Sequence, residues 1–142
     1  LKGWTDMGLS FAATLRASRL DAITTFAGNG ALIRLYTGTK PTTAGGAATT
    51  LLAELVCGTP FAAAANSGTG QLTLSAITQD SSADNTGSAG WFRLVKSDGT
   101  TVVMEGTVGT SSADLIMPST SITATQPVQI TSFVITEANT WP

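Results

Sequence analysis

The feature that most constrains the fold is a change of pattern at Gly30. Before it, residues 9–27 contain neither Gly nor Pro, whereas the rest of the chain alternates short apolar runs with clusters of Gly, Ser, Asn, Asp and Pro. Short runs rich in β-branched residues and bounded by turn residues are typical of strands, while an unbroken stretch of about 19 residues suits a helix. The sequence therefore predicts one helix followed by an all-β region.

The first stretch predicts an amphipathic N-terminal helix. Gly28-Asn29-Gly30 follows it and suits a helix C-terminus. At about 100° per residue, an apolar arc of about 120° contains Phe11, Ala12, Leu15, Ala22, Ile23 and Phe26. Arg19 projects from the middle of this arc. Either its stem lies along apolar surface with its head in water, or the arc packs on another chain and Arg19 meets a carboxylate there.

Seven strands are predicted in the remaining chain. They are Ala31–Thr37, Thr49–Cys57, Gln71–Ile77, Gly90–Lys96, Thr101–Val108, Ser121–Thr125 and Val128–Thr136. Asp98-Gly99 between two of them is the strongest hairpin signal, and 87–90 (GSAG) is interpreted as a turn. Strands this closely spaced predict a mainly β fold, an antiparallel β-sandwich or small barrel. Residues 1–30 would form an arm and the helix, and residues 31–142 the β domain.

Composition excludes several classes of function. The chain has no His, one Cys and only 11% charged residues. Without His, a His-based triad or metal ligand is impossible, and one Cys excludes an intrachain disulfide or a Cys-rich zinc site. Seven basic residues and a net charge of −2 are a poor basis for binding nucleic acid, and no apolar run approaches about 18 residues. No cofactor, nucleic acid or membrane partner is predicted, and Cys57 is interpreted as a small buried hydrophobe.

Acidic residues raise two possible chemistries. The loop 80–85, with Asp80, Asp84 and Asn85, holds oxygen ligands but lacks the alternate spacing and final Glu of calcium loops. It is therefore interpreted as a turn capped by side chains, and no metal site is predicted. Glu54 and Glu105 lie in predicted strands and would face either a common cleft or solvent; no spacing brings two acids together for glycoside hydrolysis. The protein is predicted not to be an enzyme.

Aromatic residues and small-residue loops mark expected contact surfaces. Trp91 is expected in the core, whereas Trp4 and Trp141 near the ends are expected to dock on this domain or a partner. Loops 42–48 and 62–70 are expected to be mobile or to order only against a neighbour. In residues 128–135 apolar residues occur at both parities, which fits burial on both strand faces.

Several segments together resemble a known family. They are Gly30–Pro41 (GALIRLYTGTKP), Leu51–Leu55, Asp80–Asp84, Gly87–Arg93 and Val128–Thr136. From about residue 9 to 136, the layout resembles small structural proteins of tailed bacteriophages, including the cementing (head-decoration) proteins of short-tailed phages. The resemblance implies a jelly-roll-like β-sandwich that binds the outside of an icosahedral capsid, often as a dimer. It carries over no catalytic residues.

The resulting hypothesis is a non-enzymatic virion structural protein. It would cement neighbouring subunits of the major capsid protein, as a homo-oligomer with a dimer favoured, on the capsid exterior after a period in the host cytoplasm. The predicted interface residues are Phe11, Leu15, Arg19, Ile23, Phe26, Trp4 and Trp141. Two alternatives stay open. One is a carbohydrate- or receptor-binding module with a sugar-stacking face of Trp91, Tyr36, Trp4 and Trp141, and the other is a phage tail or connector component.

Overall fold

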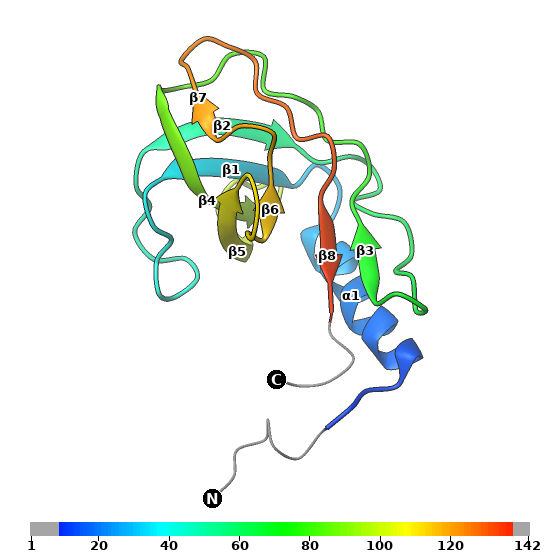
Figure 1. Ribbon diagram of the computed structural model, residues 1–142. Coiled ribbons are helices and arrows are strands. Elements are labelled where there is room, and N and C mark those ends of the chain that lie inside the picture. Colours follow the sequence, from blue (N-terminus) through cyan, green and yellow to red (C-terminus); the bar gives the residue numbers. More distant parts are fainter. Residues whose placement is uncertain (1–8, 138–142) are drawn as a thin grey trace, which may run out of the picture.

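The protein folds as a mainly β structure with one N-terminal helix (Figure 1). The computed structural model describes residues 9–137. Helix α1 spans Ala13–Ala27, and the strands that follow are β1 (Leu32–Thr37), β2 (Leu51–Val56), β3 (Gln71–Thr73), β4 (Gly87–Val95), β5 (Val102–Gly109), β6 (Leu115–Ile116), β7 (Ser121–Ile122) and β8 (Val134–Thr136). The predicted order, one helix and then strands, is confirmed.

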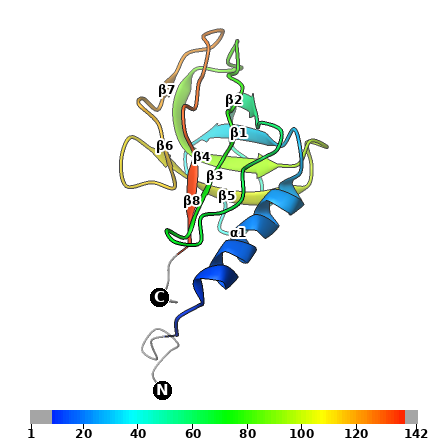
Figure 2. The same cartoon turned by 90° about the vertical axis from the view of Figure 1, so that its right-hand side faces the viewer.

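The strands form two sheets. The larger one has six strands in the order β2-β1-β4-β5-β6, with β7 paired to β4, and the smaller pairs β3 with β8. β5 and β6 run parallel, so the large sheet is mixed, and the expectation of a purely antiparallel arrangement is wrong. Figure 2 shows the small sheet crossing the direction of β4 and β5, with α1 beside it.

The predicted hairpin at Asp98-Gly99 is confirmed, because β4 and β5 pair antiparallel on either side of it. The predicted turn at 87–90 is wrong, since these residues begin β4. Their small size serves a close approach: a Cβ at Gly90 would collide with the carbonyl oxygen of Gly38. A Gly inside a strand often marks such an approach. A segment rich in Gly and Ser has the composition of a turn, which is why the sequence favoured one here.

The later predicted strands are shorter than expected. Of the stretches 71–77, 121–125 and 128–136, only three, two and three residues pair as strands, and β6 was not predicted. Single contacts replace continuous pairing elsewhere, such as the isolated bridge between Asp80 and Val128. Burial in the last stretch is uneven: Val128, Ile130 and Phe133 are buried, whereas Val134 is 37% exposed. Burial on both faces is thus confirmed only in part.

One hydrophobic core joins the helix and both sheets. Leu20 and Ala27 of α1 belong to the same buried cluster as Leu35 of β1 and Leu72 of β3. Phe92 of β4 meets Phe133, just before β8, edge to face with ring centroids 5.2 Å apart. Burying each such side chain stabilises the fold by about 1.5–3 kcal/mol. Cys57 is 3% exposed in this core, as predicted.

Trp91 is buried on the other face of the large sheet. It stacks on Tyr36 at 4.4 Å between ring centroids, and its indole N–H donates to the Thr37 carbonyl at 3.1 Å and the Thr49 hydroxyl at 3.0 Å. The guanidinium of Arg93 lies 5.2 Å from its ring centroid. The expected burial of Trp91 is confirmed, but in a small aromatic cluster separate from the main core.

Candidate functional site

Helix α1 has two apolar sides, and only one is buried. Its buried residues are Arg16, Leu20 and Ala27, which lie outside the predicted apolar arc. Within that arc, Leu15 is 47% and Phe26 is 49% exposed. The prediction of a simple amphipathic helix is therefore wrong, because Leu20 and the small Ala27 supply the contact with the domain. The predicted apolar arc faces mostly outward.

The exposed side forms a defined surface, which we call the helix stripe: Leu15, Arg19, Ala22 and Phe26. Lys96 covers the end of this stripe, with its ammonium nitrogen 4.5 Å from the centroid of the Phe26 ring, a cation–π contact. The stripe is thus apolar along its length and positively charged at its middle and one end.

Of the other predicted interface residues, Phe11 is half-buried and packs under the Arg19 guanidinium, 4.9 Å from the ring centroid. Ile23 is half-buried and packs against the core. Trp4 and Trp141 lie outside the described residues.

Two arginines tie the helix to the end of β8. Arg19 forms an ion pair with the Glu137 carboxylate at 2.6 Å, and Arg16 donates from Nη1 to the Glu137 backbone carbonyl at 3.3 Å. Arg19 therefore meets a carboxylate, but on its own chain and not on a partner as one interpretation required. With its side chain 41% exposed, Arg19 still borders the helix stripe.

The loop 42–48 is ordered by its own sheet. Arg93 donates to the Gly46 carbonyl at 2.6 Å, and the Gly45 amide donates to Glu105 at 3.0 Å. Arg93 and Glu105 pair at 2.5 Å, with side chains 12% and 2% exposed. Because a buried charge is costly without a partner, Arg93 and Glu105 stay paired. The pair in turn binds the loop backbone at Gly45 and Gly46 and so holds the loop in place. The expectation that the loop orders only against a neighbour is therefore wrong.

The loop 62–70 is ordered in the same way. The Ala65 amide donates to the Asp21 carboxylate of α1 at 2.7 Å. The Asn66 side chain accepts from the amides of Gly68 and Thr69, an Asx-type turn. Phe61, 1% exposed, anchors the start of the loop. Both small-residue loops are thus exposed but held by their own chain.

Glu54 and Glu105 lie on one face of the large sheet without forming a pair. They end a row across four strands, in which Glu54 is opposite Arg34, Arg34 opposite Arg93 and Arg93 opposite Glu105. Arg34 binds Glu54 at 2.6 Å and also donates to the Gly99 carbonyl at 2.8 Å. Each carboxylate is therefore neutralised by an arginine, and two arginines separate them.

The acidic loop 80–85 covers the edge of β2. The Asp80 carboxylate accepts from the amide of Ser82 at 2.9 Å and from that of Glu54 at 3.0 Å, and the Asn85 amide side chain donates to the Leu51 carbonyl at 2.9 Å. The interpretation of capped turns is confirmed. Across residues 9–137, no three His, Cys, Asp or Glu side chains gather as a metal site would need.

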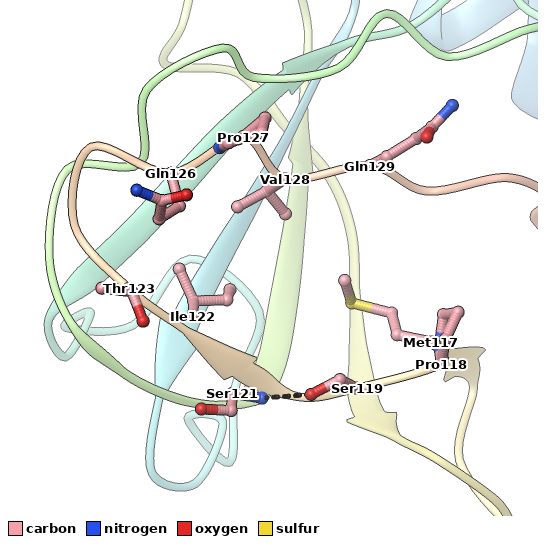
Figure 3. Close-up of a pocket in the computed structure, with 10 residues that line it drawn as sticks. All are labelled: Met117, Pro118, Ser119, Ser121, Ile122, Thr123, Gln126, Pro127, Val128 and Gln129. Carbon is pink, nitrogen blue, oxygen red and sulfur yellow. Dashed lines mark hydrogen bonds between the residues drawn. The ribbon is translucent and has the colours of Figure 1, made fainter.

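A surface hollow that the sequence did not indicate lies between β7 and the segment before Ile130. Figure 3 shows its ten lining residues, with Met117, Ile122 and Val128 as an apolar floor and Ser, Thr and Gln side chains around it. Its volume is about 280 Å³. None of the lining residues is charged, so the hollow assembles no general acid or base. Pro118 and Pro127 lie in the bends that frame it, but two isolated prolines do not predict a hollow.

Comparison with protein-family models, with curated proteins and with solved structures finds no match to this chain. Among residues 9–137, no helix is both long and apolar enough to cross a bilayer.

Proposed function

We propose that this protein is a non-enzymatic virion structural protein that binds the outer surface of an icosahedral phage capsid and cements neighbouring major capsid protein subunits. The observation that carries the proposal is the helix stripe. Leu15 and Phe26 are each about half exposed on a helix whose buried side, with Arg16, Leu20 and Ala27, is fixed to the domain. An exposed apolar surface on a rigid helix is typical of a protein–protein contact.

The chemistry of the stripe suits a capsid groove with an acidic rim. Leu15, Ala22 and Phe26 would enter an apolar groove, while Lys96 would meet a carboxylate at its border; Arg19 is already paired with Glu137. Each contact is small, but many copies on one shell, each bridging two subunits, add up through avidity. The ordered loops 42–48 and 62–70 give further exposed backbone for contacts with the shell.

We further propose that the two sheets form a reduced jelly-roll-like sandwich and that the protein acts as a dimer. The contact of Phe92 with Phe133 between the sheets supports the sandwich. The resemblance to phage head-decoration proteins supports the dimer, which equilibrium sedimentation of the purified protein would test.

The proposal is tested on capsids of the phage that encodes this chain, purified without the protein. We expect the wild-type protein to co-sediment with these capsids. Leu15→Lys and Phe26→Lys should each weaken binding about tenfold or more, because a side chain worth about 1.5–3 kcal/mol on burial is replaced by a charge. Val56→Lys, at a residue 41% exposed on β2, is the matched control and should bind normally. Unchanged binding by both helix variants would refute the role of the stripe.

The carbohydrate-binding alternative requires exposed aromatic rings on which a sugar can stack. Of the four residues predicted for this role, the structure describes Tyr36 and Trp91. Tyr36 and Trp91 are 6% and 0% exposed and stack on each other, so neither ring face is open to a sugar. The other two residues of the predicted sugar-stacking face, Trp4 and Trp141, lie outside the described residues, and the exposed helix stripe is the observation that favours a capsid-binding protein.

A further inference from the structure

We propose that the free edge of β8 is a second binding site, which accepts an extended peptide segment with a basic residue by β-strand addition. Arg19 of the helix stripe pairs with Glu137, just after β8, but no residue of the stripe lines the hollows beside β8, and the inference does not rest on the proposed capsid function.

The register of the small sheet leaves one edge of β8 unused. Glu137 donates to the Gly70 carbonyl at 2.8 Å, and the Leu74 amide donates to the Phe133 carbonyl at 3.0 Å. Hydrogen-bonded and non-hydrogen-bonded positions alternate along an antiparallel pair. The amides and carbonyls of Val134 and Thr136 therefore point away from β3, and no strand among residues 9–137 pairs with them.

The opposite edge of the same sheet is covered. Asn66 and Gln71 exchange backbone hydrogen bonds of 2.8 and 3.3 Å, and Ala62 forms a bridge with Leu74. β3 is thus flanked on both sides, whereas β8 is flanked on one. An unprotected edge is a ready template for another strand.

Two hollows flank β8 and suit the side chains of an added strand. One, of about 210 Å³, is lined by Phe92, Met104 and Ile135 among others. The other, of about 330 Å³, includes Ile116, which is 49% exposed. Both hollows include Phe133 and Val134. In strand addition the main chain supplies affinity, and pockets for alternate side chains supply specificity.

The charged side chains beside β8 favour a basic peptide as the added strand. The charged side chains that line the hollows are both acidic, Glu105 and Asp114. Arg93 neutralises Glu105. The exposed Asp114 accepts from the Thr107 amide and hydroxyl, which are neutral donors, and none of the ion pairs within residues 9–137 involves it. A second copy paired through this edge would bring another Asp114 to the same rim, so the structure favours a different chain with Lys or Arg beside the added strand.

The test uses a fluorescently labelled peptide of alternating Thr and Val with Lys at both ends. Its fluorescence anisotropy should show saturable binding at up to millimolar protein, and added salt should weaken it. The same peptide N-methylated at every residue, which removes the amide donors of both strand edges, is the control and should not bind. Absence of saturable binding by the unmodified peptide would overturn the inference.

Protein variants locate the site. Val134→Pro removes an amide that points away from β3, so the small sheet loses no hydrogen bond, and peptide affinity should fall about fivefold or more. Asp114→Asn keeps a hydrogen-bond acceptor for Thr107 and should reduce the salt dependence. Leu15→Lys should bind the peptide normally, which separates this site from the helix stripe.

Amide hydrogen exchange on the wild-type protein gives a readout that needs no variant. Bound peptide should slow exchange of the Val134 and Thr136 amides and leave the Asn66 amide unchanged. Peptide binding with no protection at Val134 and Thr136, or binding by Val134→Pro at full affinity, would show that the peptide binds elsewhere.

Discussion

At the scale of residues, the acidic groups mainly organise backbone. Asp80 joins the amides of Ser82 and Glu54. Asp98 accepts from the hydroxyl and amide of Thr101 and from the amide of Thr100, and these bonds hold the pKa of its carboxyl well below the usual range. Such caps explain why a chain with 11% charged residues can build so many ordered turns.

Cys57 gives a test of burial at the same scale. Burial raises the pKa of its thiol to about 12, and the thiolate is the reactive form. We expect negligible labelling by a thiol reagent at pH 8 in the native protein and complete labelling after unfolding in urea. Native labelling as fast as in urea would contradict the buried position.

The same pKa shift predicts a pH dependence of stability. The folded state favours the neutral thiol, so this contribution is fully present below the unfolded pKa of about 8.5 and is lost as the pH rises toward 12. The free energy of unfolding of the wild-type protein should fall over this range more steeply than that of Cys57→Ala, measured by urea denaturation.

At the scale of elements, α1 shows that an apolar arc does not by itself identify the buried side of a helix. Leu20 and Ala27 pack into the core, whereas Leu15 and Phe26 face outward. The bonds of Arg16 and Arg19 to Glu137 settle the rotation of the helix, and Glu137 is more than 100 residues away along the chain.

Matched Leu→Ala variants test this rotation. Leu20→Ala should lower the free energy of unfolding by about 2–5 kcal/mol, because it leaves a cavity in the core. Leu15→Ala should change it by less than about 0.5 kcal/mol, as expected for an exposed site. Urea denaturation measures both, and a larger cost at Leu15 would mean that the helix packs through the other side.

At the scale of the whole molecule, the helix and both sheets share one core, with Phe133 at the junction between them. Phe133 meets Phe92 of the large sheet, and its backbone carbonyl accepts a hydrogen bond from the Leu74 amide beside the small sheet. The two sheets should therefore unfold together and not as separate units.

Phe133→Ala tests that cooperativity. We expect a loss of about 3–5 kcal/mol with a single unfolding transition that fluorescence and circular dichroism report at the same urea concentration. Ile116→Ala, at a residue 49% exposed, is the control and should cost much less. Two separate transitions in the wild-type protein would show that the sheets are independent.

The sequence by itself determined the local structure. The break at Gly30, the β-branched runs and Asp98-Gly99 placed the helix, the longer strands and the β4–β5 hairpin, because these depend on backbone preferences and turn chemistry within a few residues. The burial of Cys57 and Trp91 and the capped turns of loop 80–85 followed from residue type for the same reason. The exposed stripe residues Leu15 and Phe26 were also named from the pattern.

Only the tertiary structure decided what depends on contacts between distant segments. Three features depend on such contacts: the rotation of α1, the parallel pairing of β6 with β5, and the pairing of Arg93 with Glu105 under loop 42–48. In each, the local sequence of one segment does not indicate the segment that it contacts. The strand at Gly87 was missed because its small residues serve a close approach to Gly38 and not a turn. Among residues 9–137 no strand pairs with the outer edge of β8, and local preference cannot reveal such an open edge, since it results from how distant segments pack.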